Sequence, residues 1–477
     1  MDNRVNAMNK IKVVGTIGSI DHVEEVIQNL ILNGVDAIKI DMNNFSKDDG
    51  KNVIDIVRML NKKCDTNTGI IVEIGGPTIR LGKFQNGEAY FKTGDKIRLY
   101  ITDILGDETK AKIDYKNIIG ELNKDDLLSI NKNSVKLKVY EKGEDFLICE
   151  VLKGGLVIDN ANVEINDEFN ETKSAMRTKD IENIEFANEM RVDYIELPHI
   201  KTSDDVMMVT DMLISLKNDH TNVLSKIENE SAIEDIDNII KISDGVLIDR
   251  NNLSAEIPME RIPGIQKIII NKCRRIGKIS VVSVDIPINT DNIPTRVEVQ
   301  DIANASLDGV DGILLNDEIK VNSNYVETIN KIESILKEIE TSIDYTNMFE
   351  EAAREENADV TGMIATNVAA TANKLKCKAI IAPTITGYTA RKISRFRPSC
   401  PIIAVSPSYE TVTSLSLHFG INAVLIDDLN SLDKIIKISE NITRGLVTLN
   451  EGDKIIITGG YPFKESKNTN FMKIEEI

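Results

Sequence analysis

The chain has 477 residues, and its 57 Lys and Arg face 76 Asp and Glu, which gives a formal net charge of −19. This acidic balance argues against a nucleic-acid binder or an anionic-membrane binder, so an anionic ligand would need a local basic pocket. The length is enough for roughly two to four domains. Five scattered cysteines form no C-x-x-C pair, and no signal peptide or long apolar run is present, so a reducing cytoplasm is the expected compartment.

The first part of the chain alternates strand and helix patterns. Residues 11–17 are rich in β-branched side chains, and apolar residues then repeat at helical spacing over residues 22–33. The strand pattern returns at residues 37–42 and 69–74, with a second helical segment between them. This rhythm predicts parallel β/α architecture.

A second pattern begins after Gly82. Short alternating segments follow one another at residues 89–91, 96–101, 135–140 and 146–151, broken by Gly and Asp turns. We expect residues 84–171 to form an inserted all-β domain.

The β/α rhythm then resumes. Strand candidates are residues 194–200, 222–228, 245–250, 279–285 and 312–317, each followed by a helical pattern. With the first three they make eight, which predicts a (β/α)8 TIM barrel formed by residues 1–83 and 172–342, with the insertion as a lid over its C-terminal face. Residues 343–477 continue the alternation and predict a smaller C-terminal α/β domain.

Lys226 and Glu228 lie two residues apart in an apolar strand pattern, so their side chains project from the same side. A lysine beside a carboxylate at the C-terminal end of a barrel strand favours chemistry on anionic substrates with a metal ion. The alternative is a surface ion pair at a strand end.

Longer sequence runs carry a resemblance to the pyruvate kinase family over essentially the whole chain. The matching runs include G-G-P-T-I-R-L-G at 75–82, S-K-I-E-N at 225–229, S-D-G-V-L-I-D-R at 243–250, P-T-R-V-E-V-Q-D-I-A-N-A-S-L-D-G at 294–309 and T-G-Y-T-A-R at 386–391.

The resemblance implies a glycolytic reaction in which phosphoenolpyruvate gives its phosphoryl group to ADP, leaving pyruvate and ATP. It implies Mg²⁺ (or Mn²⁺) and K⁺ as cofactors. Lys226 then neutralises the transferring phosphoryl group and the enolate, and Glu228 is one ligand of the divalent cation. Arg80 matches a basic residue on the phosphate side, and Arg250 keeps the arginine of the family's A-R-G-D loop.

Several positions depart from the family pattern in the implied substrate and metal sites. The A-R-G-D-L-G run reads D-R-N-N-L-S at residues 249–254, so the substrate-binding loop contains Asn251 and Asn252, and the second ligand of the divalent cation is Asn252 in place of aspartate. An amide oxygen brings no charge, so the cation should bind more weakly. Lys39 replaces an arginine and loses its planar, bidentate grip on a phosphate.

The monovalent-cation site and the protonation step also differ from the family. The implied ligands of the monovalent cation are Asp41, Asn43 and Glu73, with Ile74 where the family has threonine. Val284 stands where the family has a threonine hydroxyl near the enolate, and valine can neither donate nor relay a proton.

A hydroxyl-rich turn in the C-terminal domain contains Thr384, Thr386, Gly387 and Thr389 at the start of a helix pattern. In some members of the family this loop holds a sugar-phosphate effector, and the geometry would suit a phosphate. The alternative is a helix N-terminus capped by its own threonines.

Three functions stay open from the sequence. The first is a divergent pyruvate kinase with weakened activity, acting on phosphoenolpyruvate and nucleotide. The second is an inactive homologue that binds a metabolite or associates with an intact pyruvate kinase. The third is a metal-dependent keto-acid enzyme on the same scaffold. The resemblance implies a homotetramer, and we expect no nucleic-acid or membrane partner.

Overall fold

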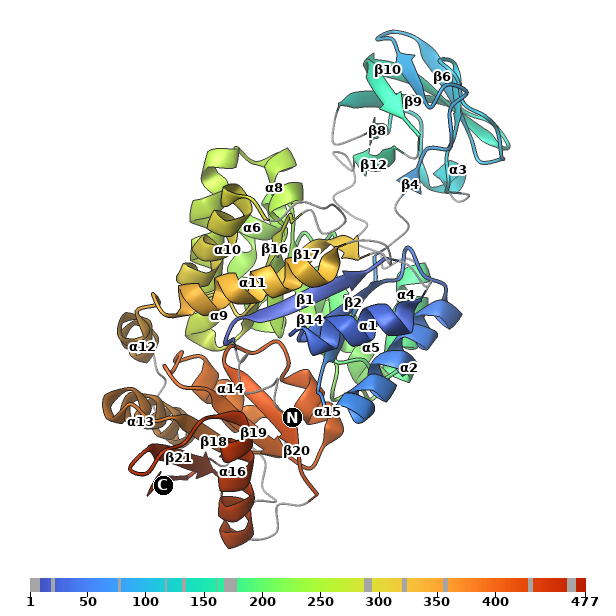
Figure 1. Ribbon diagram of the computed structural model, residues 1–477. Coiled ribbons are helices and arrows are strands. Elements are labelled where there is room, and N and C mark those ends of the chain that lie inside the picture. Colours follow the sequence, from blue (N-terminus) through green and yellow to red (C-terminus); the bar gives the residue numbers. More distant parts are fainter. Residues whose placement is uncertain are drawn as a thin grey trace. The chain divides into compact units, whose positions relative to one another are not determined.

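The computed structural model describes residues 9–18, 22–75, 79–115, 118–130, 134–159, 161–166, 178–286, 294–319, 324–354, 359–427, 432–460 and 469–477 (Figure 1). The chain divides into two compact units. One contains Met1–Ile74 and Asp180–Ile477, and the other contains Gly75–Lys179.

Eight parallel strands close into a barrel in the order β1-β17-β16-β15-β14-β13-β3-β2, which confirms the predicted TIM barrel. The strands are β1 (Lys12–Ile17), β2 (Ala37–Asp41), β3 (Gly69–Glu73), β13 (Tyr194–Leu197), β14 (Asn222–Ile227), β15 (Gly245–Ile248), β16 (Ile279–Val284) and β17 (Gly312–Ile319). Their side chains are almost wholly buried, because the barrel interior and the surrounding helices cover both faces of the sheet.

Helices surround the barrel strands (Figure 1). They are α1 (Val23–Leu32), α2 (Lys47–Cys64), α4 (Thr178–Glu189), α5 (Ser203–Ser215), α6 (Glu230–Glu234), α7 (Ile236–Ile242), α8 (Arg250–Glu256), α9 (Ile262–Ile276), α10 (Arg296–Asp308) and α11 (Tyr325–Glu340). In α1 the buried residues are the apolar ones at helical spacing, beginning with Val23 and Val26. None of the described helices is long and apolar enough to cross a membrane.

Two barrel strands, β13 and β15, end two or more residues before the predicted segments 194–200 and 245–250 do. β13 ends at Leu197 because His199 adopts a left-handed backbone with φ 59°, which turns the chain out of the sheet. β15 ends at Ile248 because the Asp249 side chain accepts hydrogen bonds from the backbone N–H groups of Asn251 and Asn252, and so caps α8.

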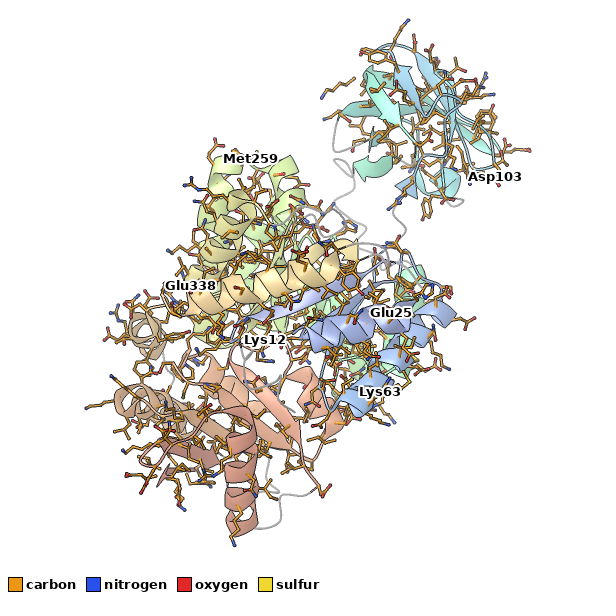
Figure 2. All side chains as sticks on the ribbon, in the orientation of Figure 1. Lys12, Glu25, Lys63, Asp103, Met259 and Glu338 are labelled. Carbon is orange, nitrogen blue, oxygen red and sulfur yellow. The ribbon has the colours of Figure 1, made fainter. Side chains whose placement is uncertain are left out.

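The unit Gly75–Lys179 is a β-structure with a core of its own. Its seven-stranded sheet contains β4 (Ile79–Arg80), β12 (Asn162–Asn166), β8 (Leu127–Ile130), β9 (Val135–Lys142), β10 (Phe146–Lys153), β6 (Lys96–Tyr100) and β7 (Lys110–Lys112), and a two-stranded sheet pairs β11 (Gly155–Ile158) with β5 (Glu88–Phe91). The four segments expected as strands in this region are strands. A short helix, α3 (Ile118–Glu121), adds to the expected all-β pattern. Asp103, labelled in Figure 2, is an exposed residue of this unit.

The C-terminal residues form a five-stranded sheet in the order β20-β19-β18-β21-β22 with helices packed against it. Its elements are α12 (Tyr345–Ala353), α13 (Val360–Leu375), β18 (Ala379–Pro383), α14 (Tyr388–Ser394), β19 (Ile402–Ser406), α15 (Tyr409–Ser414), β20 (Ile421–Leu425), α16 (Leu432–Leu446), β21 (Lys454–Gly459) and β22 (Phe471–Glu476). The predicted α/β domain is confirmed. The sequence patterns predict no strand at β22. Its position at the end of the sheet order, its antiparallel pairing with β21 and its partly exposed residues fit an edge strand.

Four aspartates tie the barrel strands together in pairs at their N-terminal ends. Each aspartate directly precedes a strand and accepts a hydrogen bond from a backbone N–H at the start of the neighbouring strand. The bonds run from Val13 N to Asp36 Oδ2 (2.9 Å), Ile70 N to Asp193 Oδ2 (2.8 Å), Val223 N to Asp244 Oδ2 (3.0 Å) and Ser280 N to Asp311 Oδ2 (3.0 Å). Lys12, labelled at the start of β1 in Figure 2, adds an ion pair to Asp36. Together the four bonds tie all eight strands.

Two of these aspartates also hold the C-terminal domain against the barrel. Arg397 donates to both carboxylate oxygens of Asp311, at 2.8 and 2.9 Å, and the backbone N–H of Phe419 donates to Asp311 Oδ1 at 3.1 Å. Thr413 donates its hydroxyl to Asp193. Arg397 and Asp311 are both buried, so this bidentate ion pair joins the two domains away from water.

Replacing Arg397 with alanine would leave the Asp311 carboxylate buried without its cation. We expect the free energy of unfolding to fall by about 3–5 kcal/mol, the usual cost of breaking a buried pair from one side. Urea denaturation followed by circular dichroism measures this loss. Lys47→Ala is the control, because Lys47 forms a 3.5 Å ion pair with Glu182 in which both side chains are about half exposed. That variant should lose less than about 1 kcal/mol, and an equal loss in both variants would contradict the anchoring role of Arg397.

His418 is a second buried group at this contact. Burial first, and then the charge of Arg391, lower the pKa of its imidazole from 6.5 to about 3. The folded chain therefore keeps His418 neutral at a pH where the unfolded chain takes up a proton. The stability contributed by the neutral form is complete above pH 6.5 and is lost as the pH falls toward 3, by about 1.4 kcal/mol per pH unit.

The variant His418→Gln removes this titration. We expect its free energy of unfolding to fall less than that of the wild type between pH 7 and pH 5.5, by about 1 kcal/mol. Denaturation curves at the two pH values test this, and parallel losses in the two proteins would show that His418 does not titrate as described.

Candidate active site

Charged side chains from neighbouring strands meet at the C-terminal end of the barrel. Lys39 comes from β2, Glu73 from β3, Glu196 from β13 and Lys226 from β14, and Glu228 directly follows β14. All five are at most about one-eighth exposed. The structure thus brings four of the predicted site residues, Lys39, Glu73, Lys226 and Glu228, together with Glu196.

Lys226 lies among three carboxylates. Its Nζ is 3.3 Å from Asp249 Oδ2, 3.5 Å from Glu228 Oε2 and 3.6 Å from Glu73 Oε1. Burial opposes the charge on Lys226, but Glu73 and Glu228 outweigh it and hold the pKa of the ammonium well above its usual value. Lys226 is therefore a permanent cation near neutral pH.

Lys39 joins two carboxylates at shorter distances. Its Nζ is 2.8 Å from Glu73 Oε2 and 2.8 Å from Glu196 Oε2. Glu73 thus bridges the two lysines, with one oxygen facing each of them. The charges run in a continuous chain from Glu196 through Lys39, Glu73 and Lys226 to Glu228.

The three glutamates of this chain ionise differently. Burial raises the pKa of Glu196 to about 7, since its neighbour Lys39 only partly offsets the cost of a wholly buried charge. Burial acts on Glu73 in the same direction, but Lys39 and Lys226 together lower its pKa to about 2. For Glu228, the hydrogen bond from His199 and the charge of Lys226 outweigh burial and hold the pKa far below its usual range.

Asn252 donates hydrogen bonds to two carboxylates of the cluster. Its Nδ2 donates to Glu228 Oε2 at 2.7 Å and to Asp249 Oδ2 at 3.1 Å. The first turn of α8 positions this amide, because Asp249 caps that helix. A cation would need the amide oxygen of Asn252, and a half-turn of the amide exchanges its oxygen with its nitrogen.

His199 occupies the opposite side of Glu228. Its Nδ1 lies 2.8 Å from Glu228 Oε1, and its backbone N–H donates to the same oxygen at 2.5 Å. The hydrogen bond to Glu228 raises the pKa of the imidazole. Both oxygens of Glu228 are therefore engaged by partners on this chain, one by His199 and the other by Asn252 and Lys226.

Three further predicted site residues lie after β15, at the start of α8, and at the end of β16. Arg250 donates to the backbone carbonyl of Ser283 and to Asp301 Oδ2, each at 3.2 Å. Asn251 donates to Asp285 Oδ1 at 2.7 Å. Val284 ends β16 as a buried residue and offers no hydroxyl.

The predicted monovalent site contains an oxygen without a partner. Asn43 Oδ1 is buried and has no hydrogen-bond partner among the described residues, while its backbone N–H donates to Asp41 Oδ1 at 2.9 Å. Burial and the nearby charge of Glu73 raise the pKa of Asp41. An unpaired oxygen next to a carboxylate suits a cation, so Asp41 and Asn43 fit K⁺, whereas Glu73 is already held by the two lysines.

A divalent cation at this site would need oxygen ligands from the substrate and from water in addition to those of the protein. No three His, Cys, Asp or Glu side chains in the described parts of the chain are arranged so that they could hold a metal ion by themselves. Mg²⁺ is commonly bound by one or two carboxylates together with substrate oxygens and water. Glu228 and the amide oxygen of Asn252 fit that arrangement.

Arg80 belongs to the unit Gly75–Lys179. It is on β4, where it pairs with Asn162 of β12 and is exposed.

The threonine-rich turn of the C-terminal domain leads into α14, whose N-cap is Gly387 with φ 75° and no side-chain cap. The alternative that α14 is capped by its own threonines is therefore not observed. Thr384 and Thr389 are buried, and Thr386 is exposed. The hydroxyl of Thr389 is bonded to that of Thr469 at 2.7 Å.

Reasoning from the sequence missed Glu196 and the contacts of Asp249 and His199. A glutamate inside the apolar run Y-I-E-L was the available signal, because a carboxylate in a buried strand needs a partner. The identity of that partner, Lys39, could not be read from the sequence, because the two residues are 157 positions apart.

Comparison with known proteins covers most of the chain. Residues 8–329 match the family model for the pyruvate kinase barrel domain, and residues 362–475 match that for the pyruvate kinase alpha/beta domain. The chain is similar to the pyruvate kinase of Clostridium perfringens (strain 13 / Type A), with 34% identity over 98% of this chain and 100% of the relative. It is also similar to the pyruvate kinases of Sporosarcina psychrophila, with 31% identity over 98% of this chain and 81% of the relative, and of Clostridium acetobutylicum, with 29% identity over 98% and 100%. The chain belongs to the pyruvate kinase family.

Proposed function

We propose that the chain is a pyruvate kinase-type phosphotransferase that converts phosphoenolpyruvate and ADP to pyruvate and ATP at a reduced rate. The observation that carries the proposal is the pair formed by Lys226 and Glu228, whose Nζ and Oε2 lie 3.5 Å apart at the C-terminal end of the barrel. Phosphoryl transfer depends chiefly on the positioning of the reactants and on stabilisation of their charge. Lys226 supplies a fixed positive charge, and Glu228 beside it can bind a metal ion.

Lys226 has the central role in this proposal. Its ammonium stays protonated and would face the charge that develops on the phosphoryl oxygens and on the enolate. Glu228 and Asn252 would hold Mg²⁺ or Mn²⁺, and Asp41 and Asn43 would hold K⁺. When bound, the divalent cation would supply further positive charge beside the transferring group.

Two features support a reduced rate. The carboxylates around Lys39 and Lys226 occupy the cations that an anionic substrate needs. Val284 brings no hydroxyl to the site where the enolate would receive its proton, so the proton has to come from water or another group. The loss of one such group commonly lowers kcat by a factor of about 10² or more.

A cytoplasmic location, assembly as a homotetramer, Arg80 as a phosphate contact and an effector site at Thr384–Thr389 are further proposals. Their support is the family resemblance alone. The domain limits 84–171 and 343–477 are likewise proposed.

The first test is a coupled assay of phosphoenolpyruvate and ADP with Mg²⁺ or Mn²⁺ and K⁺. We expect slow turnover in the wild type and a fall of about 10³-fold or more in Lys226→Met, which removes the central cation. Lys241→Met is the matched control, because Lys241 is exposed on α7. Its rate should equal that of the wild type.

No turnover in the folded wild type would contradict the proposal. In that case an inactive, metabolite-binding homologue becomes the better assignment. Metal-dependent consumption of oxaloacetate without nucleotide would instead assign a keto-acid enzyme on this scaffold.

The second test restores a charged ligand. In Asn252→Asp a second carboxylate joins Glu228, so we expect the Mg²⁺ concentration for half-maximal activity to fall by about ten-fold, because hard cations prefer charged oxygens. A Mg²⁺ titration of both proteins measures this change. An unchanged or higher Mg²⁺ requirement would show that residue 252 does not reach the cation.

A further inference from the structure

The two lysines of the barrel cluster are already paired within the protein. Lys39 contacts the carboxylates of Glu73 and Glu196, and Lys226 contacts those of Glu73, Glu228 and Asp249. Four carboxylates thus surround two ammonium groups. A phosphorylated acid that enters this cluster meets cations that are already outnumbered by carboxylates.

The two ends of the cluster differ from its centre. Glu73 bridges both lysines and Glu228 carries three further hydrogen bonds, so both are needed to hold the cluster together. Glu196 is wholly buried, and the described contacts of its side chain are with Lys39 alone. Asp249 uses Oδ1 to cap α8, and its Oδ2 accepts a hydrogen bond from Asn252 Nδ2 and faces Lys226.

We propose that Glu196 and Asp249 are specificity residues that compete with an anionic substrate for Lys39 and Lys226 and so lower the affinity of the site for phosphoenolpyruvate. This proposal rests on the proposed function, since it concerns the same site. Glu196 acts on Lys39 at one end of the cluster, and Asp249 acts on Lys226 at the other.

The physical basis is competition between anions for the same cations. A carboxylate at 2.8–3.3 Å from an ammonium, in a site largely closed to water, attracts it strongly and repels a second anion placed nearby. An incoming phosphoryl or carboxylate group must displace this partner or accept the repulsion. Neutralising the competitor should therefore strengthen substrate binding.

Glu196 and Asp249 could also have the opposite effect and strengthen substrate binding, and the test distinguishes this second outcome. Extra carboxylates could hold a metal ion that bridges the protein to the substrate phosphate. In that case their neutralisation would weaken substrate binding in the presence of Mg²⁺. The sign of the change in affinity separates the two roles.

The experiment uses Glu196→Gln and Asp249→Asn in the full chain. Both changes remove a charge at nearly constant shape, and the asparagine can still cap α8 through its side-chain oxygen. Binding of phosphoenolpyruvate is measured by isothermal titration calorimetry with and without Mg²⁺ at about pH 8, where Glu196 is mostly ionised because its pKa is about 7. We expect the Kd of each variant for phosphoenolpyruvate to be about ten-fold lower than that of the wild type. The decrease should be larger without Mg²⁺ than with it.

The matched control is Asp219→Asn. Asp219 is 93% exposed and lies before β14, at the end of that strand opposite to Lys226. This variant changes the net charge by the same amount, so an equal gain in affinity would assign the effect to overall charge and overturn the proposal.

The outcomes separate this inference from the proposed function. Tighter binding by both variants supports the inference, even when the coupled assay shows no turnover and thereby contradicts the proposed function. Unchanged or weaker binding by both overturns the inference, and turnover by the wild type would then leave the proposed function standing. If only one variant binds phosphoenolpyruvate more tightly, and circular dichroism shows that the other is folded, the competition occurs only at the lysine that contacts the first variant's residue. That result overturns the proposal that both carboxylates compete.

Discussion

The hydrogen bonds from four aspartates to the starts of neighbouring strands fix the geometry on which the rest of this protein depends. Each bond joins a carboxylate to a backbone N–H and so sets the stagger of one strand pair at the end of the barrel remote from the charged cluster. The buried members Asp193 and Asp311 also receive the C-terminal domain. The contacts that stabilise the barrel and attach the C-terminal domain therefore lie at the N-terminal end of the strands. Residues at the C-terminal end can change without breaking these contacts.

In the charged cluster at that other end, two ammonium groups are held by four carboxylates of the same chain. Lys39, Glu73 and Lys226 form its centre, and a change at any of them shifts the ionisation of the others. The charged groups of such a cluster have oppositely charged partners even when no ligand is bound. The cations of this site have partners within the chain, which is the physical ground for the proposed reduced rate.

Sequence patterns were sufficient for the barrel and insufficient for the details of the site. The β-branched runs and helical spacing predicted all eight strands, because burial on both faces leaves a continuous apolar signal. The early ends of β13 and β15 depend on the backbone of His199 and on the cap formed by Asp249, which the strand pattern does not show. Lys226 and Glu228 could be found because they are close in sequence, whereas the contact of Glu196 with Lys39 depends on the order of strands around the closed barrel.

The tie between Asp193 and Ile70 spans the place where the chain leaves the barrel to form the unit Gly75–Lys179. Its two residues are 123 positions apart, against 23 for the tie between Asp36 and Val13. If the intervening chain were flexible, closing the longer loop would cost about 1.5 kcal/mol more in entropy. Since the inserted unit has a hydrophobic core of its own, its early folding would bring these two strands near each other and shorten the effective loop. The insertion would then assist closure of the barrel during folding.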